Sequence, residues 1–263
     1  MRREEAAALI EWLVEMGADE IVADQAIDRF QPVPSTPAVQ LSPREPAVAA
    51  PPLVNPTGNA VDDAKAIAAA CRTLKEIIAA LKEFDACPLK RTATQLALCD
   101  GNPQAHVMCI GEAPGREEDL QGKPFVGRSG QLLDRMLSAI GLSRNAEDPA
   151  QAAFITNVIF WRPPGNRTPT EQETLMCLPF LKRTIEILKP RAILCVGATP
   201  TQRLSGRTDG ILKLRGKWFD FATGEVTIPM LATLHPAYLL RNPAHKRLAW
   251  RDLLSLRKAL DAQ

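Results

Sequence analysis

Four side chains suited to binding and chemistry lie near short apolar runs of this chain. Glu112 comes after the run 107–110, Asn157 lies in the run 153–160, and His235 follows the run 227–233. Phe125 lies in a loop between two glycines, where a core residue is unexpected. An aromatic face stacks on a flat ring, a side-chain amide pairs with one ring edge, and an imidazole stabilises an oxygen that gains negative charge. The set predicts chemistry on a nucleobase that has left its stack.

Two glycine-containing loops follow the first apolar run. Gly111 opens the turn 111–115, and its glycines allow backbone amides to approach a ligand closely. The second loop, 122–127, carries Phe125 and leads into a helix for which Ser129 is the predicted N-cap. Open α/β sheets bind ligands beyond the carboxyl ends of their strands. The sequence therefore predicts a site where these loops converge.

Apolar runs and amphipathic segments alternate from residue 87 onward. Strands are predicted at 106–110, 153–160, 191–196 and 227–233, and helices at 129–141, 170–188, 198–205 and 244–261. This alternation favours an α/β fold with three α-β-α layers around a central, mainly parallel four-stranded sheet. An additional hairpin is expected near 212–221, before the last strand.

The chain divides into three parts by composition. Residues 1–30 have helical spacing and predict a small helical appendage, which could dock an unknown protein, compete with DNA as an acidic mimic or add solubility. Residues 31–59 contain eight prolines among alanine, serine and valine, which is typical of an extended linker. A helix predicted at 62–84 then leads into a domain that spans 60–263.

Charge and cysteine usage restrict the class of protein. The net charge of +2 combines an acidic part, 1–85, with 8 Lys and Arg against 14 Asp and Glu, and a basic part, 86–263, with 24 against 16. A basic domain favours a nucleic-acid partner. The six cysteines form no CxxC pair, which is typical of a reduced, cytoplasmic protein. No apolar run has the ~20 residues of a membrane span, and the amino end lacks the features of a secretory signal.

Each candidate residue also has an ordinary structural interpretation. Asn157 can satisfy backbone groups at a strand end, and His235 can be a hydrogen-bonded loop residue. Phe125 alone is more often part of a core, and Glu112 can be a solvent-facing carboxylate. Their joint placement after successive strands is what favours a functional site.

A resemblance to a known family rests on motifs in a fixed order. The chain has GEAPG and EED, then GKPFVGRSGQLL, ITN and RPPGNR, and finally HPAYLLRNPAHKRLAWRDL. These motifs resemble those of the family 4, thermostable-type uracil-DNA glycosylases of the uracil-DNA glycosylase superfamily. The resemblance covers 87–263, about two-thirds of the chain.

The resemblance implies roles for individual residues. Glu112 and Ala113 would line the uracil pocket and help position water, and His235 would stabilise negative charge on O2 as the N-glycosidic bond breaks. Family 1 enzymes carry an aspartate at the position of Ala113, so stabilisation of the leaving base should dominate here. Gly111, Phe125 and Asn157 would bind the base, with stacking by Phe125 and recognition of the O4 and N3 edge by Asn157. The DNA-binding set would be Leu239, Leu240 and Arg241, which enter the duplex, together with Asn242 and Lys246.

The chain departs from this family at its iron–sulfur cluster. Family 4 enzymes resemble one another in four cysteines that hold a [4Fe–4S] cluster, and Cys87 and Cys177 match two of these positions. Phe84 and Trp161 occupy the other two, and neither side chain can donate a thiolate. We therefore predict no cluster, no metal and no other cofactor, with an apolar plug in the cluster's place.

The leading hypothesis is a monofunctional DNA-repair glycosylase of base excision repair. It would act as a cytoplasmic monomer on uracil in single- or double-stranded DNA and would not bind a membrane. An alternative is a binding module with the same fold, which recognises uracil or abasic DNA with little or no turnover. A third hypothesis, another nucleotide-directed hydrolase with the same fold, would be indicated by cleavage of free nucleosides.

Overall fold

The computed structural model describes residues 58–224 and 226–262. The predicted appendage at 1–30, and the linker up to residue 57, lie outside the described residues. Among the described residues, none of the helices combines the length and apolar content that crossing a membrane requires.

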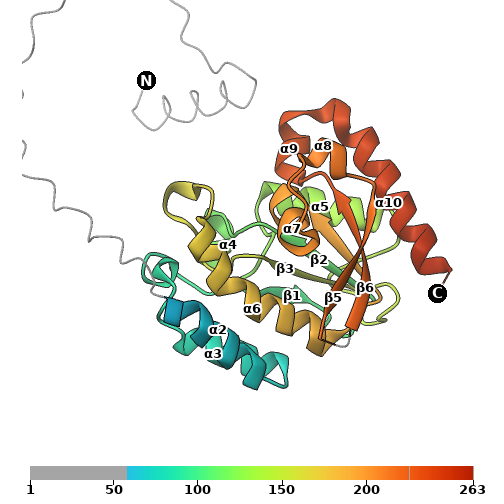
Figure 1. Cartoon of the computed structure of the whole chain (residues 1–263). Helices are drawn as coiled ribbons and strands as arrows, with labels where there is room; N and C mark the ends of the chain where they lie inside the picture. The colour runs from blue at the N-terminus through green and yellow to red at the C-terminus, as the bar shows by residue number, and fades with distance from the viewer. Residues whose placement is uncertain (1–57, 225, 263) are drawn as a thin grey trace, which may run out of the picture. The chain divides into compact units, whose positions relative to one another are not determined.

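A six-stranded sheet in the order β1-β3-β2-β4-β6-β5 organises the described residues (Figure 1). The strands are β1 (Cys99–Gly101), β2 (Val107–Gly111), β3 (Ala153–Asn157), β4 (Ala192–Val196), β5 (Trp218–Thr223) and β6 (Val226–Thr233). β3, β2, β4 and β6 are mutually parallel, as the sequence predicts. The four-stranded prediction is incomplete because β1 and β5 add antiparallel edges.

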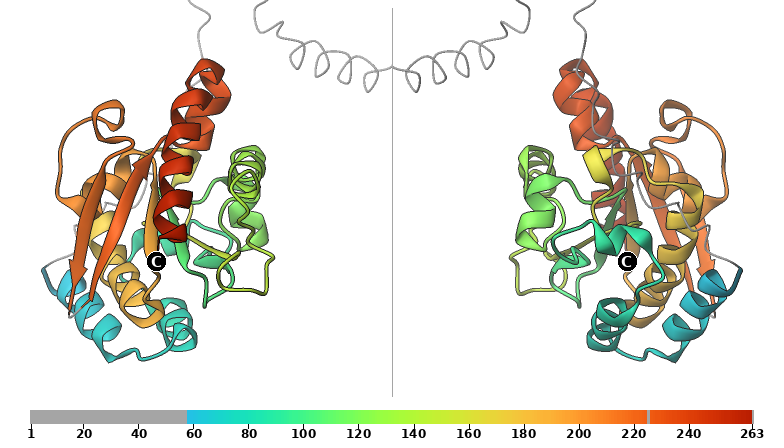
Figure 2. Two further views of the ribbon diagram at one scale, coloured as in Figure 1. Left: turned by 90° about the vertical axis from the view of Figure 1, so that its right-hand side faces the viewer. Right: turned by 90° about the vertical axis from the view of Figure 1, so that its left-hand side faces the viewer.

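Helices cover both faces of the sheet, which confirms the three-layer α/β prediction (Figure 2). One face packs against α2 (Gly58–Ala70), α3 (Leu74–Glu83), α6 (Glu171–Leu188) and α7 (Ala198–Ser205). The other packs against α5 (Arg128–Ser138), α9 (Pro236–Arg241) and α10 (Lys246–Asp261). Short helices α4 (Arg116–Gln121) and α8 (Ile211–Leu214) and the 3-10 turns η1 (Pro88–Arg91), η2 (Pro164–Asn166) and η3 (Pro243–His245) complete the elements.

The alternation of side chains along β2 shows why its run is continuously apolar. Met108 and Ile110 enter the core under α6, whereas Val107 and Cys109 enter the core under α5. Successive side chains of a strand point to opposite faces, so a strand covered on both sides is apolar at every position.

Two expectations about individual elements are wrong, and a third is confirmed only in part. The helix expected at 62–84 is two helices, because the Thr73 side chain accepts a hydrogen bond from the Glu76 N–H and caps a new start. Helix α5 is capped by Gly127, so Ser129 lies inside its first turn. The expected hairpin at 212–221 is confirmed only from Trp218, since Leu212 belongs to α8.

The strand order places a switch in chain direction beside β2. The chain passes from β2 to its neighbour β3, and then crosses to β4 on the other side of β2. Ligands of open α/β sheets bind in the crevice that forms at such a switch, outside the carboxyl ends of the strands.

Candidate active site

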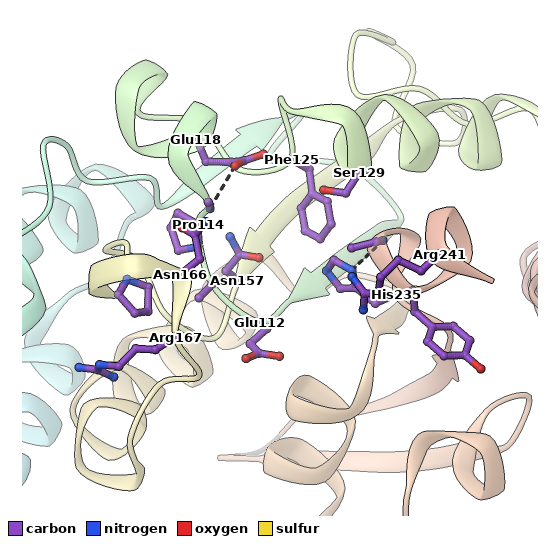
Figure 3. Close-up of a pocket in the computed structure, with 15 residues that line it drawn as sticks. Glu112, Pro114, Glu118, Phe125, Ser129, Asn157, Asn166, Arg167, His235 and Arg241 are labelled. Carbon is purple, nitrogen blue, oxygen red and sulfur yellow. Dashed lines mark hydrogen bonds between the residues drawn. The ribbon is translucent and has the colours of Figure 1, made fainter. Parts of the chain in front are cut away.

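A cavity of about 510 Å³ lies at the carboxyl ends of the parallel strands (Figure 3). Its walls come from the turn after β2, the loop before α5, the end of β3, the loop after β3, and the start of α9. The lining residues are Glu112, Ala113, Pro114, Gly115, Glu118, Phe125, Ser129, Asn157, Pro163, Asn166, Arg167, His235, Ala237, Tyr238 and Arg241.

Phe125 and Asn157 meet over Gly111, the last residue of β2. A Cβ atom at position 111 would lie 2.4 Å from Asn157 Oδ1 and 2.4 Å from Phe125 Cε2. Only glycine fits beneath both groups, because real Cβ contacts are longer than this. The predicted base-binding residues therefore converge, and Gly111 makes their approach possible.

Asn157 presents a polar atom without a protein partner. The residue is 1% exposed and pairs with Gly111 in the parallel ladder of β2 and β3. Its Oδ1 atom is buried and has no hydrogen-bond partner within the described part of the chain. Buried polar groups are nearly always paired, so an unpaired one in a cavity wall indicates a place for a ligand.

His235 is the third member of this group and is N-terminal to α9. Its ring centroid lies 5.6 Å from that of Phe125, at an interplanar angle of 30°. Nδ1 accepts a hydrogen bond from the Ala237 N–H at 3.1 Å, so the proton of the neutral imidazole is on Nε2. Burial, and then the positive charge of Arg241, lower the pKa of His235 to about 4. At neutral pH the ring is thus an uncharged donor.

Glu112 is positioned by a residue from another element. Its Oε2 accepts a hydrogen bond from Thr199 Oγ1 of α7 at 2.9 Å, and its carboxylate lines the cavity (Figure 3). The Val158 and Ile159 amides donate to the carbonyls of Gly111 and Glu112, which fixes the start of the turn against β3. Ala113, next in the chain, also lines the cavity and provides no side-chain acid or base.

The predicted DNA-binding residues divide into two groups. Arg241, Asn242 and Lys246 are exposed, and Leu240 is half-buried. Leu239 is 1% exposed and packs in the core under α5 and α10. The register of α9 turns the Leu239 side chain inward, so this conformation does not present it to DNA, and its entry into the duplex stays a prediction.

The chain matches the family described as the uracil DNA glycosylase superfamily over residues 99–254. The match spans more than half of the chain and includes all strands of the sheet. The chain belongs to the uracil-DNA glycosylase superfamily.

Similar proteins include type-4 uracil-DNA glycosylases from two thermophiles. The protein from Thermotoga maritima is 40% identical over 184 residues, which are 68% of this chain and 91% of that protein. The protein from Saccharolobus solfataricus is 40% identical over 169 residues, 62% of this chain and 76% of that protein. A type-5 uracil-DNA glycosylase from Pyrobaculum aerophilum is 31% identical over 153 residues, covering 53% and 64% of the two chains.

Several cavity residues of this superfamily member were absent from the sequence-based set. Glu118, Asn166, Arg167 and Tyr238 all line the cavity. The RPPGNR and HPAY motifs contain three of them, so their place in quoted motifs was the available signal. The quoted EED motif contains Glu118, and a second signal is its position three residues after Gly115, where a glutamate often caps the N-terminus of a helix.

The four positions that the family resemblance matches to cluster ligands lie in one buried apolar core, and we call these four residues the plug. Phe84, Cys87, Trp161 and Cys177 are all 5% exposed or less and belong to the core under α6. The Phe84 ring packs edge-on against Phe180 at a centroid distance of 5.3 Å.

The plug does not fit a four-thiolate cluster. The neighbouring Cys87 thiol, and then burial, raise the pKa of Cys177. Across residues 58–224 and 226–262, no group of three or more His, Cys, Asp or Glu side chains is arranged to hold a metal. Two aromatic rings stand where two sulfur ligands would be needed.

Proposed function

We propose that this protein is a monofunctional uracil-DNA glycosylase, which removes uracil from DNA by hydrolysis and leaves an abasic site. The observation that carries the proposal is the convergence of Phe125, the unpaired Oδ1 atom of Asn157 and the neutral His235 in one cavity. The names of the relatives from Thermotoga maritima and Saccharolobus solfataricus support the same activity.

The geometry suggests how the base is recognised. A uracil that has rotated out of the DNA stack lies against the Phe125 ring, and its O4 and N3 edge faces the Asn157 amide. The amide carries both an acceptor oxygen and a donor nitrogen, which complement N3–H and O4. Because Oδ1 is already buried without a protein partner, pairing with uracil removes an existing cost.

The reaction is a heterolytic cleavage followed by addition of water. The electron pair of the N-glycosidic bond leaves with uracil, whose negative charge spreads to O2, and the sugar becomes cationic. His235 donates its Nε2–H to O2, and one well-placed donor of this kind contributes about 3–4 kcal/mol to transition-state stability. Water then adds to the sugar carbon and releases a proton, which balances the proton that the departed uracil anion takes up.

Glu112 is the carboxylate that we assign to the water. Thr199 fixes its orientation through the 2.9 Å hydrogen bond, and Ala113 offers no competing acid. A carboxylate near a cationic sugar also stabilises that charge. Charge stabilisation at uracil O2 is the larger contribution in this assignment, and Glu112 orients the attacking water.

DNA contacts are assigned to the exposed part of α9 and the start of α10. Arg241, Asn242 and Lys246 are placed for backbone phosphates, which position DNA without reading its sequence. Leu240, half-buried next to them, takes the role of entering the space that the base vacates. We include in the same proposal that the protein acts on uracil in single- or double-stranded DNA. It acts there as a cytoplasmic monomer.

A glycosylase assay tests the function directly. Full-length protein is incubated with single- and double-stranded oligonucleotides that contain one uracil, and free base and alkali-labile strands are measured. We expect both products, and a much slower release of both with Phe125→Ala. Protein that retards these DNAs on a gel but releases no uracil would instead be a binding module with this fold.

We also propose that the protein functions without an iron–sulfur cluster. The support is the mismatch between the plug and a set of four thiolates. Protein purified without oxygen should be colourless and contain far less than one iron per chain. Stoichiometric iron with broad visible absorbance would contradict this proposal and leave the glycosylase assignment intact.

A further inference from the structure

Phe125 has an unusual backbone conformation for its residue type. Its φ angle is 54°, in the left-handed region, and it is one of three non-glycine residues with positive φ in the described part of the chain. Such a conformation persists only where the surrounding structure enforces it. Part of the enforcement is close packing, since a Cβ atom at Gly130 of α5 would lie 1.9 Å from the Phe125 carbonyl oxygen.

The Glu118 carboxylate holds one side of the Phe125 loop. Oε1 accepts hydrogen bonds from the amides of Val126 and Gly127, at 3.0 and 2.9 Å. Oε2 accepts one from the Gly115 amide at 3.0 Å, in the turn after β2. Glu118 is 6% exposed, so these charge-assisted bonds are shielded from water. One carboxylate therefore links the turn after β2 to the loop that carries Phe125.

The Arg144 guanidinium holds the other side of the loop. It donates from Nη1 to the Pro124 carbonyl at 3.0 Å and from Nη2 to the Phe125 carbonyl at 2.7 Å. Asp134 and Asp100 fix the guanidinium in turn, at 2.8 and 3.1 Å, and its side chain is 8% exposed. The peptide groups on both sides of Phe125 are thus bonded to buried charges.

We propose that Glu118 and Arg144 are positioning residues for the reaction, which clamp the loop so that the Phe125 ring lies over Gly111 in register with Asn157 and His235. The proposal rests on the proposed function of Phe125 as the stacking residue. Both charged groups bond to the loop backbone and not to the ring. They therefore set where the ring lies and leave its face free for the base.

Asp119, the next residue of α4, offers a matched control. It is also buried, at 4% exposed, and also accepts three hydrogen bonds. Its donors are the Thr94 amide, the Thr94 hydroxyl and the Gln95 amide, at 2.8, 3.0 and 3.2 Å. Asp119 links α4 to the 94–95 loop and makes no hydrogen bond to the Phe125 loop. Asp119→Asn therefore removes a similar number of buried hydrogen bonds without touching the loop that carries Phe125.

The test compares Glu118→Gln with Asp119→Asn. The glutamine cannot accept at both terminal atoms, so at least one of the two anchor points loses its bond. With a uracil-containing single strand, we expect Glu118→Gln to raise KM about tenfold and to change kcat less, because stacking acts on the bound base before and during cleavage. Asp119→Asn should leave KM unchanged at a comparable loss of thermal stability.

A double-mutant cycle separates positioning from general destabilisation. In a Phe125→Ala background, Glu118→Gln should change KM less than about twofold, because its effect passes through the missing ring. Additive effects, or equal effects of Glu118→Gln and Asp119→Asn, would overturn the proposal. If Glu118→Gln does not fold, Arg144→Lys takes its place in the same cycle, since lysine cannot bond both carbonyls with a planar fork.

A second readout does not depend on activity. Protein labelled with 4-fluorophenylalanine gives a 19F NMR line for residue 125, which is assigned by its loss in Phe125→Leu. We expect Glu118→Gln to shift or broaden this line and Asp119→Asn to leave it unchanged. An unchanged line in Glu118→Gln contradicts the clamp. Wild-type protein that releases no uracil contradicts the proposed function, while the NMR line still tests the clamp.

Discussion

The cavity and the plug both bury side chains, but the cavity buries strained and polar groups, whereas the plug buries well-packed apolar ones. In the cavity, Phe125 has a strained backbone, Asn157 leaves a buried oxygen unpaired and His235 has a lowered pKa. In the plug, Phe84 and Trp161 fill space with apolar contacts. Local rules of stable folding are broken in the first region and obeyed in the second. Proteins tend to break such rules where they bind or react.

The comparison teaches that the two regions have separable tasks. A plug that only stabilises the fold can be weakened without a change in chemistry, whereas the cavity can lose its chemistry with little change in stability. The following predictions test this separation in order of expected effect.

The largest effect is expected for Phe84→Ala. Removal of a buried aromatic ring typically lowers the free energy of unfolding by about 3–5 kcal/mol, through lost contacts and the cavity that remains. Urea unfolding of the full-length protein measures this change. Activity below the melting temperature should stay within about twofold of wild type, because Phe84 does not line the active-site cavity. A large loss of kcat in folded Phe84→Ala protein would show that the plug contributes to catalysis.

The next effect is expected for His235→Ala. Loss of one donor to the developing charge should lower kcat about 10²–10³-fold, as for comparable oxyanion donors. Single-turnover kinetics on a uracil-containing strand measures the chemical step. His106→Ala is the control, because His106 lies just before β2, at the end of the strand away from the cavity. A decrease in kcat of less than about fivefold would show that His235 does not stabilise the developing charge.

Asn157→Leu should separate activity from stability most clearly. Leucine has a similar shape and removes the unpaired oxygen, whose burial costs about 1–3 kcal/mol. We expect the free energy of unfolding to stay within about 1 kcal/mol of wild type or to rise, while kcat/KM falls about 100-fold. Urea unfolding and steady-state kinetics on the same preparation test both halves. A variant that is less stable by several kcal/mol would show that the amide is structural.

Much of the fold was predictable from the sequence because burial on two faces requires continuous apolar strands. The four parallel strands and their alternation with helices follow from that rule, and the family prediction is confirmed by the superfamily match. β1 was not predictable, since Cys99–Gly101 is short and has no apolar pattern. Helix α8 was missed for a similar reason, at four residues long.

The site was predictable in part. Asn157 and His235 lie in or just after apolar runs, and Phe125 lies in the second loop after the first run, so their convergence at one sheet edge could be expected. The inward turn of Leu239 depends on how α9 packs against α5, and the role of Glu118 depends on three amides from two loops. Both are set by tertiary contacts between segments that carry no local signal.

The smallest effect concerns pH, and it follows from the state of His235. Its pKa of about 4 lies below the ordinary value of about 6.5, so the ring stays neutral from pH 8 down to about 5. NMR titration should show one histidine ring that stays neutral down to about pH 5 and that is lost from the spectrum of His235→Ala. Between about pH 6.5 and 4 the unfolded chain binds a proton that the folded chain does not, so the His235 contribution to stability is present above 6.5 and falls as pH falls. His235→Ala should therefore lose less stability than wild type over this window. If the His235 ring of the wild-type protein titrated at pH 6.5, water would reach the ring and its pKa would have the ordinary value. The contrast between the cavity and the plug would then disappear.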